Sequence, residues 1–314
     1  MQPTKTMRPE DAKEYTKRVQ SWWNDHPFTL GLAAQEGDYD ITGRVQELDE
    51  HFFREVDRKM RKQYGTSGQA EGAPLLSNLV PYADIRGKKV LDIAVGSGWS
   101  SVTLAKAGAE VTGIDLTEEA IRMTKRHAEV RGVNVTVQQM DAQEMSFPDA
   151  TFDYVLAWGC VMHMPDTERA LRQINRVLKP GGKMLAYMYN KSSWTYWFNF
   201  IFLRGILCGK LLSTRGNTTA IVSRYTDGAP KGGNMLTKVY SPSEATRMYE
   251  AAGYTNVRAW PFYIPHEVDG WPMAKFPFFR YFPMSVKKWM GERWAWGLIV
   301  TGEKDPSTRE ARSG

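Results

Sequence analysis

One segment constrains the fold of this chain more than any other: an apolar, β-branched run that leads into an acidic residue and two glycines. It reads Val90-Leu91-Asp92-Ile93-Ala94-Val95-Gly96-Ser97-Gly98. Glycines lack a Cβ, so the backbone can pass close to a ligand at the end of a strand. Seventeen residues after Gly98, the run 110–115 ends in Asp115, where nucleotide-binding α/β units place a carboxylate beside a ribose. Together these features predict a nucleotide-type ligand.

Residues 88–190 alternate between strand-like and helix-like segments. We expect strands at 89–93, 110–114, 134–139, 154–158 and 183–189, and helices at 100–106, 118–131 and 167–178. Thr117 can cap a helix whose first turn carries Glu118 and Glu119, which supports one of these boundaries. Alternation of this kind predicts an α/β fold with a parallel sheet and helices on both faces.

The flanking regions differ in composition from this core. Residues 1–87 are expected to form a helical N-terminal cap, with helices near 10–24 and 47–64. Residues 191–314 carry seven of the 11 tryptophans and are expected to hold an aromatic-rich insertion and further strands. Within them, five apolar residues fall at helical spacing and predict one stripe: Trp194, Trp197, Phe198, Ile201 and Phe202.

Bulk properties exclude several classes of protein. The net charge is +6, but 41 basic and 35 acidic residues are interspersed, so a nucleic-acid partner is not expected. Cys160 and Cys208 are the only cysteines and show no metal-binding spacing, so we expect neither a metal site nor a disulfide framework. The N-terminus lacks the apolar core of a signal peptide, which predicts a cytoplasmic protein without stable membrane insertion.

Three carboxylates follow consecutive predicted strands at one sheet edge: Asp92, Asp115 and Asp141. Mutual repulsion would make such a cluster unfavourable unless the donor groups of a ligand lie between its members. Their order along the chain therefore indicates a binding site rather than chance placement.

With these motifs, residues 88–190 resemble the class I S-adenosylmethionine-dependent methyltransferases. Five segments covering about a third of the chain carry the resemblance: 90–98, 111–116, 141–143, 152–155 and 176–182. It implies a Rossmann-like, seven-stranded, mostly parallel sheet whose last two strands, 255–263 and 298–304, form an antiparallel hairpin. It also implies that the chain is an enzyme and that S-adenosylmethionine is its cofactor.

The resemblance assigns residues to this cofactor. Asp115 would accept from both ribose hydroxyls, Asp141 would accept from the adenine amino group between Met140 and Ala142, and Asp92 would position the glycine turn. Ala94 stands where the family has its first glycine, and we expect altered packing there rather than lost binding. The full predicted cofactor set is Asp92, Ala94, Gly96, Gly98, Asp115, Leu116, Asp141, Ala142, Trp158 and Trp22.

The acceptor side is predicted just past the fourth strand, where His163 would act as a base or an orienting donor. The alternative is a histidine that caps a helix or is tied to the backbone. Tyr189 and His266 complete the predicted catalytic set, and Tyr187, Tyr263 and Glu267 are further polar candidates.

Segment 22–27 is similar to the N-terminal aromatic-His-Pro segment of a bacterial branch of these enzymes, in which such segments fold over the cofactor as a lid. This would bring four side chains near the cofactor: Tyr15, Trp22, Trp23 and His26. The alternative is ordinary packing of an aromatic helix.

Several functions remain open at this point. We expect methyl transfer to a small-molecule amine, thioether or thiol, hydroxyl or carbon nucleophile in an aromatic pocket, in a chain that is a possible homodimer. One alternative is a lipid or quinone acceptor at a membrane surface, with residues 194–212 in the interface, although burial of the aromatic stripe against the sheet is more economical. The other is a binding module that does not turn over its S-adenosylmethionine.

Overall fold

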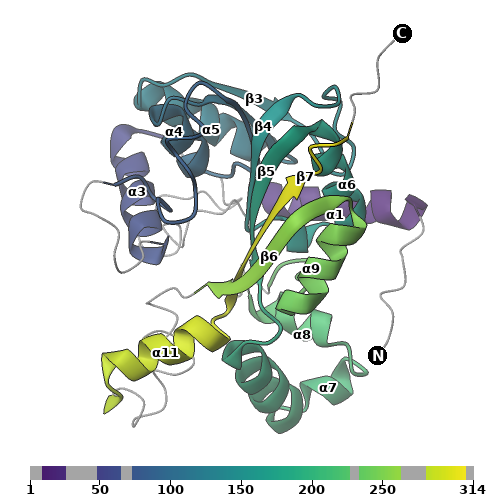
Figure 1. The fold of residues 1–314 in the computed structure, drawn as a ribbon. Helices are drawn as coiled ribbons and strands as arrows, with labels where there is room; N and C mark the ends of the chain where they lie inside the picture. Colours follow the sequence, from purple (N-terminus) through teal and green to yellow (C-terminus); the bar gives the residue numbers. More distant parts are fainter. Residues whose placement is uncertain (1–8, 26–47, 65–72, 227–232, 263–280, 309–314) are drawn as a thin grey trace.

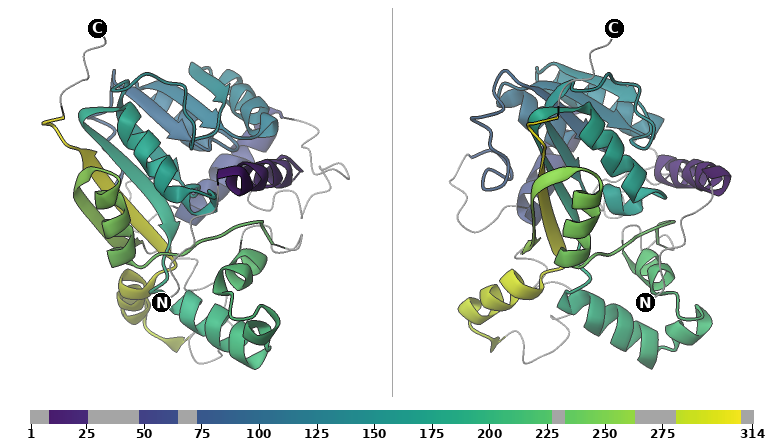
Figure 2. Two further views of the ribbon diagram at one scale, coloured as in Figure 1. Left: turned by 90° about the vertical axis from the view of Figure 1, so that its right-hand side faces the viewer. Right: turned by 45° about the vertical axis from the view of Figure 1, so that its right-hand side comes forward.

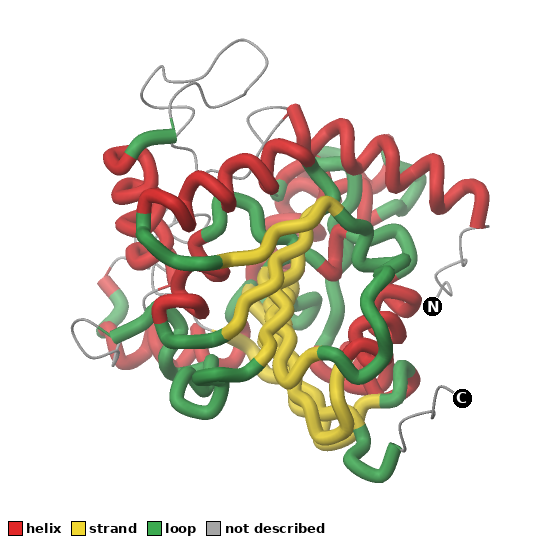
Figure 3. The backbone as a smooth tube through the Cα atoms, turned by 90° about the horizontal axis from the view of Figure 1, so that it is seen from above, coloured by secondary structure: helices red, strands yellow, loops and turns green. Residues whose placement is uncertain are grey.

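The structure is a computed structural model that describes residues 9–25, 48–64, 73–226, 233–262 and 281–308. Its centre is a seven-stranded sheet with the order β3-β2-β1-β4-β5-β7-β6 (Figure 1). The strands are β1 Lys89–Ile93, β2 Glu110–Asp115, β3 Val135–Gln139, β4 Phe152–Trp158, β5 Leu178–Tyr189, β6 Tyr254–Phe262 and β7 Gly297–Lys304. Seen from above, the sheet is strongly twisted and has helices on both sides (Figure 3).

The helices flank this sheet in two groups. On one side lie α3 Glu50–Tyr64, α4 Trp99–Lys106 and α5 Glu118–Val130, and on the other α1 Pro9–Asp25, α6 Thr167–Val177 and α9 Pro242–Ala251. The remaining elements gather at one end of the molecule: the π-helix η2 Thr195–Leu207, α7 Lys210–Ser213, α8 Thr218–Tyr225 and α11 Met284–Trp294. A short 3-10 helix, η1 Val161–His163, follows β4.

The predicted fold class is confirmed. Strands β3, β2, β1, β4 and β5 pair in parallel, and β7 pairs antiparallel with both β5 and β6. The central strands β1 and β4 are buried along nearly their whole length, because helices cover both faces, and this explains why most of their residues are apolar. The predicted antiparallel C-terminal pair is present as β6 and β7, and α11 lies in the connection between them.

Local sequence signals account for the helix boundaries. The side chain of Thr117 accepts a hydrogen bond from the backbone N–H of Ala120 and caps α5, as predicted. Asp166 caps α6 by accepting from the N–H of Arg169 at 2.8 Å, and Ser241 forms a reciprocal capping box with Glu244 at the start of α9.

The expected burial of the aromatic stripe at residues 194–202 was wrong. Trp194, Trp197 and Phe202 are 42%, 56% and 43% exposed. The segment is a π-helix, whose i→i+5 bonding widens each turn and rotates side chains away from the faces that α-helical spacing predicts. The residues it buries are Tyr196, Asn199, Phe200 and Gly205.

Gly98 joins the turn after β1 to α4 and has a left-handed backbone with φ of 80°. A Cβ built there would lie 2.9 Å from the Cα of Thr124 on α5. Gly98 therefore meets two requirements at once, a positive φ and a close approach between helices.

We expect Gly98→Ala to lower the free energy of unfolding by roughly 2 to 3 kcal/mol, because left-handed strain adds to the clash with α5. Gly132→Ala is the matched control, since Gly132 also has a positive φ but open space around its Cβ position. Denaturant unfolding should show a loss of only about 1 kcal/mol there. Equal losses in the two variants would contradict the close-packing account.

Candidate cofactor and acceptor site

A cavity opens at the carboxyl edge of the sheet, where the loops after β1, β2, β3 and β4 meet α1 and α3. Of the predicted cofactor set, seven residues line it: Ala94, Gly96, Asp115, Leu116, Asp141, Ala142 and Trp158. Asp92, Gly98 and Trp22 are not among the described residues that line it. The cavity is therefore lined by most of the predicted set, and three of its members do not line it.

Asp115 lies where β2 ends and holds the glycine turn in place. One carboxylate oxygen accepts from the N–H of Gly96 at 3.2 Å, and the other accepts from the N–H and hydroxyl of Thr117, each at 2.9 Å. Removal of this side chain from water raises its pKa, and the backbone hydrogen bonds oppose that shift. The site thus holds a partly desolvated acidic group beside the turn.

Asp92 lies beneath the turn and is buried. Its Oδ2 accepts from the hydroxyls of Ser100 and Ser101, at 2.7 and 2.5 Å, and so ties β1 to the first turn of α4. Burial raises the pKa of Asp92 to about 6, with the negative charge of Asp115 acting in the same direction. A direct contact between Asp92 and a ligand in the cavity is therefore not supported.

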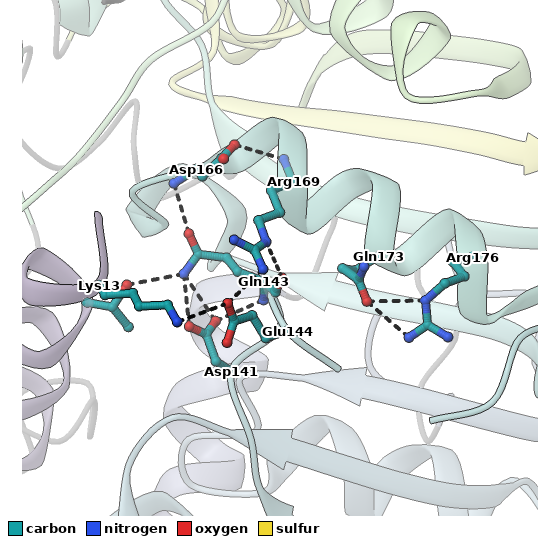
Figure 4. Close-up of polar contacts among 9 residues, drawn as sticks. Lys13, Asp141, Gln143, Glu144, Asp166, Arg169, Gln173 and Arg176 are labelled. Carbon is teal, nitrogen blue, oxygen red and sulfur yellow. Dashed lines mark hydrogen bonds and ion pairs between the residues drawn. The ribbon is translucent and has the colours of Figure 1, made fainter. Parts of the chain in front are cut away.

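Asp141 belongs to a network centred on Gln143, which Figure 4 shows. Asp141 accepts from the N–H and side-chain amide of Gln143, and that amide also donates to the hydroxyl of Thr16 on α1 at 3.3 Å. The side-chain oxygen of Gln143 accepts a hydrogen bond from the backbone N–H of Asp166, at the start of α6. Gln143 thus joins the loop after β3 to α1 and α6, a link that the sequence motif 141–143 does not reveal.

Helix α1 covers the cavity in this structure. Thr16, Val19 and Trp23 line it, and the Gln20 side chain donates to the backbone oxygen of Leu116 at 2.8 Å. Figure 2 shows α1 lying beside α6, although the two helices are far apart in the sequence.

The individual aromatic residues of this helix differ from the prediction. Trp22 packs edge-to-face on Trp23 at 4.8 Å instead of lining the cavity, so its placement in the cofactor set is not supported. Tyr15 donates to the backbone oxygen of Met235 at 2.6 Å. His26 lies outside the described residues.

His163 lines the cavity from η1 and is also tied to the backbone. Its Nδ1 lies 2.6 Å from the carbonyl oxygen of Leu236. Because a carbonyl oxygen can only accept, Nδ1 carries the hydrogen, and in the neutral ring Nε2 carries the lone pair. The structure thus shows a histidine that is tied to the backbone, and its role as a base stays a prediction. Tyr189 contacts its ring and lines the same cavity, whereas His266, Tyr263 and Glu267 lie outside the described residues.

An aromatic wall lines the same cavity as His163. The Trp158 ring stacks on Tyr187 with centroids 4.8 Å apart and planes at 19°, and Tyr64 of α3 packs on its edge. The Trp158 Nε1–H is buried and has no hydrogen-bond partner among the described residues. A buried donor left unsatisfied costs about 1 to 3 kcal/mol.

The arrangement defines a class of protein: a Rossmann-like enzyme with an acidic ribose-type site and an adjoining aromatic pocket at one sheet edge. A family model described as a methyltransferase domain matches residues 90–182. The chain is 30% identical over 244 residues to ubiquinone biosynthesis O-methyltransferase of Coxiella burnetii, covering 78% of this chain and 81% of the relative. The enzyme of that name from Aeromonas salmonicida is 33% identical over 169 residues, covering 53% and 63%.

Among solved structures, a SAM-dependent methyltransferase of Methanosarcina mazei shares the fold with a TM-score of 0.53 at 20% identity, covering 74% of this chain and 99% of that one. The chain belongs to the class I S-adenosylmethionine-dependent methyltransferases. The predicted family, enzyme class and cofactor are therefore confirmed. Within the described ranges, no helix is long and apolar enough to cross a membrane.

Burial of Asp92 predicts a pH-dependent stability. Because its pKa is raised from 3.8 to about 6, the folded state retains a proton that the unfolded state releases, so stability falls as pH rises through this range. We expect Asp92→Asn to remove this decline, which amounts to roughly 2 to 3 kcal/mol from about pH 4 to about pH 7.

Urea unfolding across this range measures the effect, and Asp153→Asn supplies a control of opposite sign. Partial burial raises the pKa of Asp153, but the ion pair with Lys179 and the other contacts outweigh this effect, so the net pKa is lowered. The stabilisation of the folded state by the ionised Asp153 is therefore lost as pH falls. Parallel profiles for wild type and Asp92→Asn would contradict the account.

Proposed function

We propose that this methyltransferase methylates a hydroxyl oxygen on a small acceptor with a flat, largely apolar body. The observation that carries the proposal is His163, whose Nδ1 is fixed by a backbone carbonyl and whose ring lines the same cavity as the aromatic wall. A hydroxyl acceptor needs a base to take its proton, and a neutral imidazole with its lone pair on Nε2 is such a base.

In this proposal, the carboxylates of Asp115 and Asp141 bind the cofactor at one end of the cavity. Asp115 accepts from the ribose hydroxyls in a charge-assisted contact, and Asp141 accepts from the adenine amino group. Met140 and Ala142 lie on either side of Asp141 in the chain and flank the ring. Gly96 leaves open space where a Cβ would otherwise stand, beside the methionine portion. When bound, S-adenosylmethionine supplies the methyl group on a positively charged sulfur together with its own leaving group.

The aromatic wall binds the acceptor at the other end of the cavity. The stacked faces of Trp158 and Tyr187 match a planar ring, and the unpartnered Trp158 Nε1–H provides a donor for a polar oxygen on it. His163 takes the hydroxyl proton on Nε2, and the Leu236 carbonyl stabilises the resulting charge through Nδ1–H.

Two observations support a hydroxyl acceptor. A thioether has no proton to lose, so it would leave the oriented histidine without a task, whereas a hydroxyl loses its proton on methylation. The relatives at 30% and 33% identity bear the name ubiquinone biosynthesis O-methyltransferase, and a hydroxylated quinone precursor has the shape and polarity that this cavity favours.

The cofactor assignment predicts that Asp115→Ala weakens binding of S-adenosylhomocysteine by ~2 to 4 kcal/mol, because a charged acceptor for two hydroxyls is lost. Calorimetric titration measures this, with thermal unfolding as a check on folding. Glu110→Ala is the control, since Glu110 is an exposed carboxylate at the opposite end of the same strand. Unchanged affinity in folded Asp115→Ala would refute the assignment.

The acceptor assignment is tested with His163→Asn, because an Asn amide can still donate to the Leu236 carbonyl but has no basic nitrogen. We expect turnover of a catechol or phenol acceptor to fall by roughly 10²- to 10⁴-fold. Affinity for S-adenosylhomocysteine should stay unchanged. A loss of cofactor affinity equal to the loss of turnover would instead indicate a purely structural residue.

A further inference from the structure

The exposed apolar side chains of this protein are not scattered over its surface. In the described part of the chain, eleven large apolar side chains are exposed, and every one of them lies at or beyond residue 194. They are Trp194, Trp197, Phe202, Ile206, Leu207, Leu212, Tyr281, Phe282, Val286, Trp289 and Trp294. They belong to η2, α7, and α11 with the residues just before it, and Figures 1 and 2 show α7 and α11 at the same end of the molecule.

The positive charge of the chain is concentrated in the same two segments. Residues 191–226 contain five Lys and Arg and no acidic residue, and residues 281–294 contain three basic residues and one Glu. The two segments therefore carry a net charge of +7, whereas the whole chain carries +6. The rest of the protein is close to neutral, so the basic character belongs to the end that exposes the apolar side chains.

We name these two segments, 191–226 and 281–294, the aromatic-basic surface. Some of its cations lie against aromatic rings: the guanidinium of Arg204 is 3.7 Å from the ring centre of Tyr225, and that of Arg293 is 4.7 Å from the ring centre of Trp289. The single acidic residue, Glu292, pairs with Lys288 at 3.9 Å. Aromatic rings beside cations are the composition that segments lying at a lipid headgroup boundary prefer.

We propose that the aromatic-basic surface docks the enzyme on membranes that contain anionic phospholipids. Exposed Trp, Phe and Leu side chains would enter the headgroup boundary, and the excess of Lys and Arg would meet the negative surface potential. The π-helix η2 has 13 residues and contains Arg204, so it is suited to lie along such a surface.

The charge argues against a second copy of the chain as the occupant. A two-fold contact through this surface would place the same excess of positive charge on both sides of one interface, and like charges face to face are unfavourable. An acidic lipid surface is complementary in both polarity and charge.

The aromatic-basic surface is also connected to the cavity. The segment 191–226 begins just after β5 ends at Tyr189, and α11 ends just before β7 begins at Gly297, directly opposite Tyr189. Trp296, just before β7, stacks on Tyr189 with ring centres 4.6 Å apart, and its ring centre lies 5.4 Å from that of Phe200 in η2. Docking would therefore bring the acceptor end of the cavity next to the lipid, a consequence that rests on the proposed function, whereas docking itself does not.

Vesicle flotation with the full chain tests the proposal without cofactor or acceptor. We expect the protein to float with vesicles of phosphatidylcholine and phosphatidylglycerol, and to remain below vesicles of phosphatidylcholine alone. Lys210→Glu combined with Arg215→Glu should weaken binding by about tenfold or more. Lys106→Glu combined with Lys125→Glu changes the net charge equally on exposed residues of α4 and α5, and should keep most of the binding.

The apolar contribution is tested with Trp197→Gln combined with Leu212→Gln, since these side chains are 56% and 87% exposed and their loss should not affect folding. This variant should lose flotation and lose quenching of tryptophan fluorescence by brominated lipid. Three results would overturn the proposal: a wild type that does not float, equal losses in the two charge variants, or a self-association in ultracentrifugation that Trp197→Gln with Leu212→Gln abolishes while flotation is unaffected.

Discussion

The carboxylate of Asp115 is the constraint on which the rest of the site depends. It occupies the position where β2 ends, and the backbone N–H groups of Gly96 and Thr117 both point at it. That convergence requires β1 and β2 to run in parallel at close register, and a Cβ at Gly113 would lie only 2.6 Å from a methyl group of Val95. The turn, the strand pair and the acidic group form one unit, and burial raises the pKa of the carboxylate at its centre.

Gln143 and helix α1 form a second unit that borders the cavity. Gln143 binds Asp141, the hydroxyl of Thr16 on α1 and the backbone of Asp166, while Gln20 of α1 binds the backbone of Leu116 beside Asp115. Helix α1 is therefore attached to Gln143, which binds Asp141, and to the backbone of the residue that follows Asp115. Release of α1 would break both attachments together.

Much of the fold and the cofactor end could be predicted, because their signals are local in the sequence. Alternating strand and helix patterns located the first five strands, the family resemblance located the last two, and an acidic residue at the end of β2 and after β3 placed Asp115 and Asp141 at the sheet edge. Other contacts could not be predicted, because they depend on how the helices pack against the sheet. Asp92 accepts from Ser100 and Ser101 of α4, His163 is fixed by Leu236, 73 residues away, and Trp23 rather than Trp22 lines the cavity. The aromatic stripe was misread because nothing in its spacing distinguishes a π-helix from an α-helix.

A crystal structure with S-adenosylhomocysteine bound tests the central claim most directly. We predict the ribose hydroxyls within hydrogen-bonding distance of the Asp115 carboxylate, the adenine beside Met140 and Ala142, and the sulfur directed toward the wall of Trp158 and Tyr187. A ligand whose ribose lies away from Asp115, or whose sulfur points away from the aromatic wall, would contradict the account.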